Sequence, residues 1–243
     1  AGVAMMLDAG VANESLAILH MTNGFGFDLA DSIKSAWEVN GELCSAGMQG
    51  YEESSSDFSG LVSAIIDDEN CEAVYLSSYY EDAAGIIEEL HNQGWDGQIF
   101  AGDGASQWDG SGLYDYMTDH SMLEDVTVTT PRAGFSYGDF EERYDDNADE
   151  VGGIKPYVLT AYDSTMILGK AIAESDEHHE LTDNIEQVGT NYEGASGLIN
   201  FLDNGDGTGN GFDICTYSGD TSDANGGYSC NRFWTAENGV EEY

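Results

Sequence analysis

Basic residues are scarce in this chain. Its 243 residues include 6 Lys and Arg against 47 Asp and Glu, which gives a formal net charge of −41 at pH 7. A surface this acidic repels phosphate backbones and anionic headgroups, so the composition argues against nucleic acid and anionic membranes as partners. Apolar residues still make up 41% of the chain, which is enough for a folded core, so the charge does not indicate disorder.

Acidic pairs recur in every region of the chain, for example Asp67-Asp68, Glu141-Glu142 and Glu241-Glu242. The charge therefore coats the molecule and does not mark one site. Self-repulsion would destabilise the folded state in dilute buffer, and salt at about 1 M, where the Debye length is about 3 Å, would screen it. We hypothesise adaptation to high salt, and an acidic secreted protein from a moderate habitat is the alternative.

The chain also lacks an initiator Met, a basic leader and any apolar run long enough to span a bilayer. We therefore expect no direct membrane insertion by this segment. We also expect that processing or truncation has removed the start, so that the native protein is longer than this chain.

Sequence motifs of catalysis are missing as well. Walker and dinucleotide-binding patterns do not occur, Ala195-Ser196-Gly197 does not complete a GxSxG motif, and no Ser, His and Asp set falls together at predicted strand ends. The segment 203–213, rich in Asp and Gly, lacks the ligand spacing and closing Glu of a calcium loop. We predict that the protein is not an enzyme and uses no cofactor or metal.

Four cysteines fall in two local pairs, Cys44 with Cys71 and Cys215 with Cys230, and neither pair has CxxC spacing. Three disulfide pairings are formally possible. The local pairing is favoured because each bond closes a short loop between predicted strands, and two such bonds indicate an oxidising, extracytoplasmic setting. Two pairs of buried free thiols are the alternative.

Apolar runs bounded by turn residues alternate with helical patterns up to residue 130, as in βαβ units that form a doubly wound parallel sheet. Strands are predicted at 15–21, 42–48, 73–77, 98–102 and 126–130. Helices are predicted at 1–9, 28–40, 57–67, 81–93 and 113–116, and the fourth of these ends at Gly94, a good C-cap. The sequence thus predicts an α/β fold.

Beyond Pro131 the pattern is mostly helical. Helices are predicted at 137–146, 157–174 and 182–188, followed by strands at 194–202 and 212–217 and a closing hairpin at 228–234. The helix at 157–174 has apolar residues on nearly all sides, so we expect it to be buried on more than one face. No predicted strand covers its second face, which indicates that a sheet is missing from the chain.

The order of four segments resembles the type I periplasmic binding proteins, specifically the branched-chain amino acid and amide group of ABC-transporter receptors. The segments are LAILHMTNGFGFDLADSIKSAW, SSSDFSGLVSAIIDDENCEAVYLSSYYEDAAGIIEELHNQGWDGQIFAGDG, PYVLTAYDSTMILGKAIAES and NYEGASGLINFLDNGDGTG. The resemblance is to the C-terminal two thirds of such receptors. It implies two α/β lobes joined by three chain crossings, with a small solute bound in the cleft by hinge closure.

The same resemblance implies how the chain is divided. Residues 1–130 and 201–243 correspond to the second, C-terminal lobe of the receptors. Residues 131–200 correspond to a return segment into the first lobe, whose sheet is mostly absent from this chain. The apolar helix at 157–174 packs on that sheet in the family.

Three positions match places where the branched-chain receptors contact ligand, namely Phe25, Tyr79 and Asp103. They follow the first, third and fourth predicted strands, and open α/β sheets bind ligands at the carboxyl ends of their strands. An aromatic wall with one carboxylate suits a small solute with an ammonium group, which Asp103 would pair with. Secondary candidates are Tyr80, Ser106 and Trp108. The alternative is structural, because aromatics can plug a sheet edge and Asp103 can cap a turn.

The resemblance implies an extracytoplasmic solute-binding protein that captures a small amino-acid-like or amide solute for an ABC permease. It implies a periplasmic or cell-surface location, with a lipid anchor in a missing N-terminal region as one form of attachment. Two alternatives keep the fold: a sensory ligand-binding domain, and a surface-layer protein that binds no ligand. A transmembrane helix in the flanking sequence, or a neighbouring permease gene, separates sensing from transport.

Overall fold

The computed structural model describes residues 1–108, 111–132, 140, 144, 156–174, 181–203, 205–207, 211–223 and 226–243. They fall into two compact units, one of Ala1–Thr130 with Asp213–Tyr243 and one of Pro131–Phe212. Apart from Phe140 and Tyr144, the helix predicted at 137–146 lies outside the described residues.

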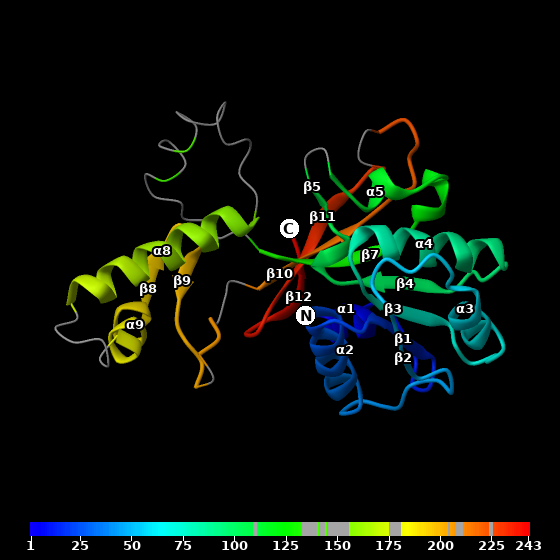
Figure 1. Ribbon diagram of the computed structural model, residues 1–243, viewed down its shortest axis with the longest axis horizontal. Coiled ribbons are helices and arrows are strands. Elements are labelled where there is room, and N and C mark those ends of the chain that lie inside the picture. Colours follow the sequence, from blue (N-terminus) through cyan, green and yellow to red (C-terminus); the bar gives the residue numbers. More distant parts are fainter. Residues whose placement is uncertain are drawn as a thin grey trace. The chain divides into compact units, whose positions relative to one another are not determined.

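The first unit is built on an eight-stranded sheet with the strand order β12-β11-β10-β7-β4-β3-β1-β2 (Figure 1). The strands are β1 (Leu16–Met21), β2 (Met48–Tyr51), β3 (Ala73–Ser77), β4 (Gln98–Ala101), β7 (Thr127–Pro131), β10 (Phe212–Thr216), β11 (Ser229–Thr235) and β12 (Gly239–Glu242). The neighbours from β2 to β7 pair in parallel, whereas β11 and β12 form an antiparallel hairpin. The segment 228–234, predicted to be a whole hairpin, therefore corresponds to β11 alone, and the second strand of the hairpin is β12.

Helices lie before and between the parallel strands. They are α1 (Gly2–Asp8), α2 (Gly24–Trp37), α3 (Ser59–Ile66), α4 (Tyr80–Asn92) and α5 (Leu113–Tyr116), with the 3-10 helices η1 (Asp103–Ala105) and η2 (His120–Leu123) and the short pair β5 (Gln107–Trp108) and β6 (Ser111–Gly112). α4 ends as its sequence predicts, because Gly94 follows the C-cap with a φ of +82°, in the left-handed region. The predicted α/β class with a doubly wound parallel sheet is confirmed.

Two cores cover the two faces of this sheet. Along β1, Leu19 and Met21 belong to the core formed with α3 and α4, while Leu16 and Ile18 belong to the core formed with α1 and α2. This alternation is the side-chain period of two that a strand imposes. Because helices cover both faces, β1 and β3 are buried along their whole length, which explains why apolar residues predominate in both strands.

The strand predicted at 42–48 is wrong, because β2 begins only at Met48. The residues before it form a turn, in which Gly47 has a φ of +64° and its N–H donates to the Cys44 carbonyl oxygen at 2.9 Å. The carboxylate of Asp68 accepts hydrogen bonds from the N–H and the hydroxyl of Ser45, both at 2.6 Å. These contacts hold residues 44–47 as a turn, so β2 starts after them, at Met48, and ends at Tyr51.

Two disulfide bonds, Cys44–Cys71 and Cys215–Cys230, brace the first unit, with Cα–Cα distances of 5.5 and 3.9 Å. The predicted local pairing is confirmed and the free-thiol alternative is wrong. One bond ties the turn before β2 to the amino end of β3, and the other joins β10 to β11. The bonds span 27 and 15 residues, and loops of this size constrain the unfolded chain by about 3 to 4 kcal/mol each.

The second unit contains α8 (Pro156–Glu174), α9 (Leu181–Gly189) and a hairpin of β8 (Tyr192–Gly194) and β9 (Gly197–Ile199). The continuous strand predicted at 194–202 is therefore wrong. The reason is Asp163 of α8, which is fully buried and accepts hydrogen bonds from Ala195 N–H, Ser196 N–H and the Ser196 hydroxyl, each at 2.7 Å. These bonds fix a tight turn on α8 where the pattern indicated an extended strand.

The burial of α8 on more than one face, expected from its sequence, is not found among the described residues. Leu159 and Ile167 are buried, whereas Leu168 and Ile172 are 43% and 55% exposed. Despite this composition, no helix in the described ranges is long and apolar enough to cross a membrane.

Candidate functional site

The carboxyl ends of β1, β3 and β4 carry the three main candidates. Phe25 lies in the first turn of α2 after β1, Tyr79 is the N-cap of α4 after β3, and Asp103 opens η1 after β4. The side chain of Asn23, the N-cap of α2, accepts Gly26 N–H at 2.8 Å and so fixes the start of the helix that carries Phe25. Because β1, β3 and β4 are parallel neighbours, these residues reach one edge of the sheet.

The rings of Phe25 and Tyr79 are stacked, with centroids 5.0 Å apart and an angle of 5° between their planes. Gly104 lets the loop after β4 approach them, since a Cβ there would overlap the Ser78 carbonyl oxygen and lie 3.3 Å from the Phe25 ring. Tyr79 is 39% exposed. The stack can therefore cover the apolar part of a solute or attract a cation to a ring face.

Asp103 is half-buried and brings a negative charge to the same edge. Below it lies Tyr75, whose phenol is buried and forms a hydrogen bond with Thr129. Burial, and to a smaller extent the charge of Asp103, raises the pKa of this phenol. Tyr75 therefore stays neutral, and the charge at this end of β4 is that of the Asp103 carboxylate.

The secondary candidates separate in the structure. Tyr80 lies in the first turn of α4, and its ring stacks on Tyr116 of α5 with a centroid distance of 5.6 Å. Ser106 is fully buried, so its hydroxyl lies below the surface that a solute reaches. Trp108 belongs to β5, and its side chain lies outside the described residues. Of these three residues, Tyr80 lies with Tyr79 along the wall of one pocket.

A pocket of about 320 Å³ opens beside Tyr79 at this edge of the sheet. We call it the tyrosine pocket. Its lining residues are Glu53, Ser54, Tyr79, Tyr80, Glu81, Asp82 and Tyr116. Aromatic rings and carboxylates are the groups that surround organic cations in proteins. The chemistry of the tyrosine pocket thus matches that of the predicted site beside it.

Sequence reasoning missed the acidic side of the tyrosine pocket. Glu53 follows β2, and the misplaced strand at 42–48 put the end of this strand too early in the chain. In the structure Asn23 Nδ2 donates to Glu53 Oε2 at 2.7 Å, so the residue that caps α2 also positions this carboxylate. The signal that could have found it is the acidic turn that directly follows Tyr51.

Asp82 is the buried carboxylate of the tyrosine pocket, with 3% of its surface exposed. Its Oδ2 accepts Ser54 N–H at 3.1 Å. Burial raises the pKa of Asp82, the hydrogen bond from Ser54 partly offsets this, and the charges of Glu81 and Glu53 raise the pKa further. The described lining contains no Lys, Arg or His, so its carboxylates create a negative potential.

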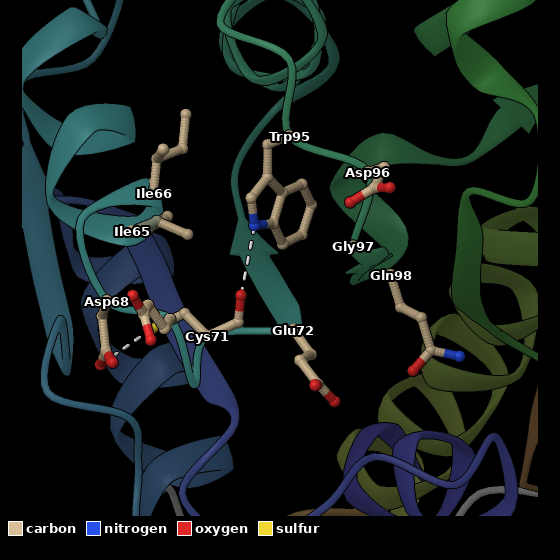
Figure 2. Close-up of a pocket in the computed structure, with 10 residues that line it drawn as sticks. Ile65, Ile66, Asp68, Cys71, Glu72, Trp95, Asp96, Gly97 and Gln98 are labelled. Carbon is tan, nitrogen blue, oxygen red and sulfur yellow. Dashed lines mark hydrogen bonds between the residues drawn. The ribbon is translucent and has the colours of Figure 1, made fainter.

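A second pocket, of about 530 Å³, lies at the opposite, amino edge of β3 and β4 (Figure 2). Trp95 forms part of its wall and donates from Nε1 to the Cys71 carbonyl oxygen at 3.2 Å. Cys44, Cys71 and Asp68 are the one group of potential metal ligands within 4.8 Å of one another in the described chain. Both cysteines are in a disulfide bond, so they offer no thiolate to a metal ion.

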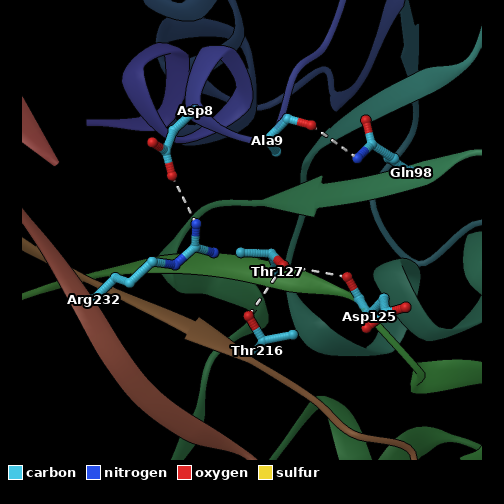
Figure 3. A network of polar contacts seen from close by, with 7 residues as sticks. All are labelled: Asp8, Ala9, Gln98, Asp125, Thr127, Thr216 and Arg232. Atoms are coloured by element: carbon cyan, nitrogen blue, oxygen red, sulfur yellow. Dashed lines mark hydrogen bonds and ion pairs between the residues drawn. The ribbon is translucent and has the colours of Figure 1, made fainter. Parts of the chain in front are cut away.

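A third pocket, of about 490 Å³, lies beside polar contacts that link α1 to β11 and β7 to β10 (Figure 3). Arg232 of β11 pairs with Asp8 of α1 at 2.8 Å. The hydroxyls of Thr127 and Thr216 lie 3.2 Å apart and join β7 to β10. These groups are engaged with one another, so the network is structural, and the carboxyl edge remains the candidate site.

Comparison with known proteins gives a consistent picture of the fold. A sequence profile described as periplasmic binding protein matches residues 2–216. The structure resembles leucine binding protein LivK from Thermotoga maritima, with 21% identity and a TM-score of 0.76, over 97% of this chain and 65% of that one. It also resembles LivJ from Streptococcus pneumoniae, solved in complex with isoleucine, with 14% identity and a TM-score of 0.66, over 90% and 61%.

A type 1 periplasmic binding protein from Bordetella pertussis is similar too, with 18% identity and a TM-score of 0.72, over 91% of this chain and 63% of that one. No curated protein matches in sequence. The chain spans less than two thirds of the length of these solved structures. Since the profile match covers most of the chain and the sheet is doubly wound, the chain belongs to the type I periplasmic binding protein family.

Proposed function

We propose that this protein captures a small amino-acid-like or amide solute outside the cytoplasm, by hinge closure, and delivers it to an ABC importer. The observation that carries the proposal is the stack of Phe25 on Tyr79, beside Asp103, at the carboxyl edge of the parallel sheet. Open α/β sheets bind their ligands at this edge. Asp103 pairs with the ammonium group of the solute, and the two rings cover its body.

We further propose that residues 1–130 and 201–243 form the second lobe of the receptor and that residues 131–200 return into the first. The boundary of the compact units at Thr130 supports the first division of this assignment, whereas the second boundary follows Phe212, so that residues 201–212 group with the return segment. The assignment is also supported by α8, which exposes Leu168 and Ile172. An apolar helix face of this kind is expected to pack against another layer, which in the proposed receptor is the sheet of the first lobe.

The proposed location follows from the same reading. Two disulfide bonds are typical of proteins that fold in oxidising compartments, and members of this family act outside the cytoplasm. In the proposed function, the partners are a small solute and an ABC permease. The net charge of −41 makes nucleic acid an unfavourable partner.

Isothermal titration calorimetry of the full-length protein tests the proposal, with a panel of amino acids, amides and urea at high salt. We expect one class of solute to bind, and Tyr79→Ala and Asp103→Asn to weaken it by at least about tenfold, the loss expected for a charge-assisted hydrogen bond or an aromatic contact. Asp31→Asn is the matched control for charge, because Asp31 is exposed further along α2. The proposal fails if no member of the panel binds.

A further inference from the structure

The tyrosine pocket shares one residue with the proposed site, because Tyr79 stacks on Phe25 and also lines this pocket. Two further rings, Tyr80 and Tyr116, line it and stack on each other with an interplanar angle of 21°. Tyr116 is 46% exposed. The pocket of about 320 Å³ therefore extends the aromatic surface of the proposed site to a second compartment.

Three carboxylates line the same space, from two different strand ends. Glu53 comes from the loop after β2, and Glu81 and Asp82 come from the first turn of α4. The amino end of a helix carries a partial charge of about +0.5, which favours anions. Three carboxylates outweigh this charge, so the pocket selects a positive group.

The arrangement favours an organic cation over a metal ion. A calcium ion takes six to eight oxygen ligands at about 2.3 to 2.6 Å. In the described chain, Glu53, Glu81 and Asp82 do not bring their oxygens within 4.8 Å of one another as a group. Carboxylates spread around a space lined by three aromatic rings suit a larger cation that also contacts ring faces.

We propose that the tyrosine pocket binds a second cationic group of the solute, an ammonium or a guanidinium, so that the protein prefers solutes with a basic side chain. This inference rests on the proposed function, since the first cationic group of the same solute pairs with Asp103. Glu53 and Glu81 attract the second group, and the rings of Tyr80 and Tyr116 contact it. Asp82, of which 3% is exposed, adds a buried carboxyl group to the lining.

Pairs of solutes with the same shape and different charge test this inference on the full-length protein. Calorimetry compares arginine with citrulline, its neutral analogue, and lysine with norleucine. We expect arginine or lysine to bind at least about tenfold more tightly than its neutral analogue, as a desolvated cation–π contact beside carboxylates allows. Glu53→Gln, Glu81→Gln and Tyr116→Ala should each reduce this ratio by about threefold or more.

Glu52→Gln is the matched control, because Glu52 is exposed beside Glu53 and does not line the pocket. Tyr116→Phe should keep the preference, since it keeps the ring. Equal binding of arginine and citrulline and of lysine and norleucine overturns the cationic subsite and leaves the proposed function standing. A calcium titration in which binding depends on Glu53 while the charge preference is absent also overturns it. If neither these solutes nor the wider panel binds, the proposed function fails and the subsite with it.

Discussion

Phe25 and Tyr79 stack nearly parallel, with ring centroids 5.0 Å apart, although they come from loops that follow different strands. Each ring thereby fixes the position of the other at the edge of the sheet. The stack lies at the strand ends, and 39% of the surface of Tyr79 is exposed to solvent there. This pre-formed aromatic surface reduces the ordering that a solute must impose on binding.

The two rings should be energetically coupled. We expect Phe25→Ala and Tyr79→Ala to be non-additive in the free energy of unfolding, with a coupling of about 1 kcal/mol, because aromatic pairs contribute roughly this much beyond their buried area. Denaturant unfolding of the wild type, both single variants and the double variant measures it. As a control, the losses in free energy of unfolding caused by Phe25→Ala and by Tyr157→Ala should add up in the double variant, because Tyr157 lies in the other compact unit. If the effects of Phe25→Ala and Tyr79→Ala on the free energy of unfolding are additive, the stack contributes no coupling.

Asp82 should make stability depend on pH. Its pKa in the folded state is raised, first by burial and then by Glu81 and Glu53, with Ser54 N–H acting in the opposite direction. Its contribution to stability is therefore full below the unfolded-state pKa and is lost as pH rises through the folded-state pKa. Asp82→Asn removes this titration and can still accept the hydrogen bond from Ser54. Relative to the wild type, this variant should gain free energy of unfolding as the pH rises above about 4, the ordinary pKa of an Asp carboxyl.

Chemical denaturation at a series of pH values provides the measurement for Asp82. The other carboxylates titrate in both proteins, so only the difference between variant and wild type is informative. Asp28→Asn, on the exposed face of α2, should give a nearly constant difference from the wild type. A difference for Asp82→Asn that shrinks as pH rises contradicts the burial argument.

Asp163 should be a large contributor to the second unit. Its carboxylate accepts three hydrogen bonds at 2.7 Å from Ala195 and Ser196 while fully buried. An Asn at this position offers one oxygen to three donors, and leaving buried donors unsatisfied costs about 1 to 3 kcal/mol each. We expect Asp163→Asn to destabilise the fold by about 3 kcal/mol in denaturant unfolding. Asp183→Asn, exposed on α9, is the control, and equal losses for both variants would remove the special role of Asp163.

Salt should stabilise the fold. The net charge is −41, and the cations that form ion pairs in the described ranges include Lys34 with Glu38 and Arg232 with Asp8. Raising KCl from about 0.1 M to about 1 M shortens the Debye length from about 10 Å to about 3 Å and screens repulsion between exposed carboxylates. We expect Tm to rise by at least about 5 °C, equivalent to roughly 1 to 2 kcal/mol for a chain of this size.

Differential scanning fluorimetry at several KCl concentrations measures this effect. Near pH 4, where carboxylates of ordinary pKa are partly protonated, the rise should shrink because less charge is left to screen. A Tm that stays constant between low and high salt at pH 7 argues against the high-salt hypothesis. It leaves the acidic secreted protein from a moderate habitat as the better interpretation.

Most strands of the first unit could be predicted because their apolar runs are continuous. The strand at 73–77 is predicted with the bounds that the structure has, since both of its faces are buried and apolar residues predominate in it. The run at 42–48 also contains apolar residues, yet the disulfide at Cys44 and the side chain of Asp68 hold its start as a turn. Long-range contacts of this kind leave no periodic signal in the sequence.

By itself the sequence determined the acidic composition, the doubly wound α/β fold and the family resemblance, because composition, hydrophobic period and segment order can be recognised without tertiary contacts. It favoured the local disulfide pairing, which the structure confirmed. The tertiary structure decided which of the candidates meet. It stacked Phe25 on Tyr79, buried Ser106, and brought Glu53 to the same pocket as Asp82 and Tyr116. The physical reason is that β1, β2 and β3 are parallel neighbours, so the sheet gathers at one edge residues that the chain keeps far apart.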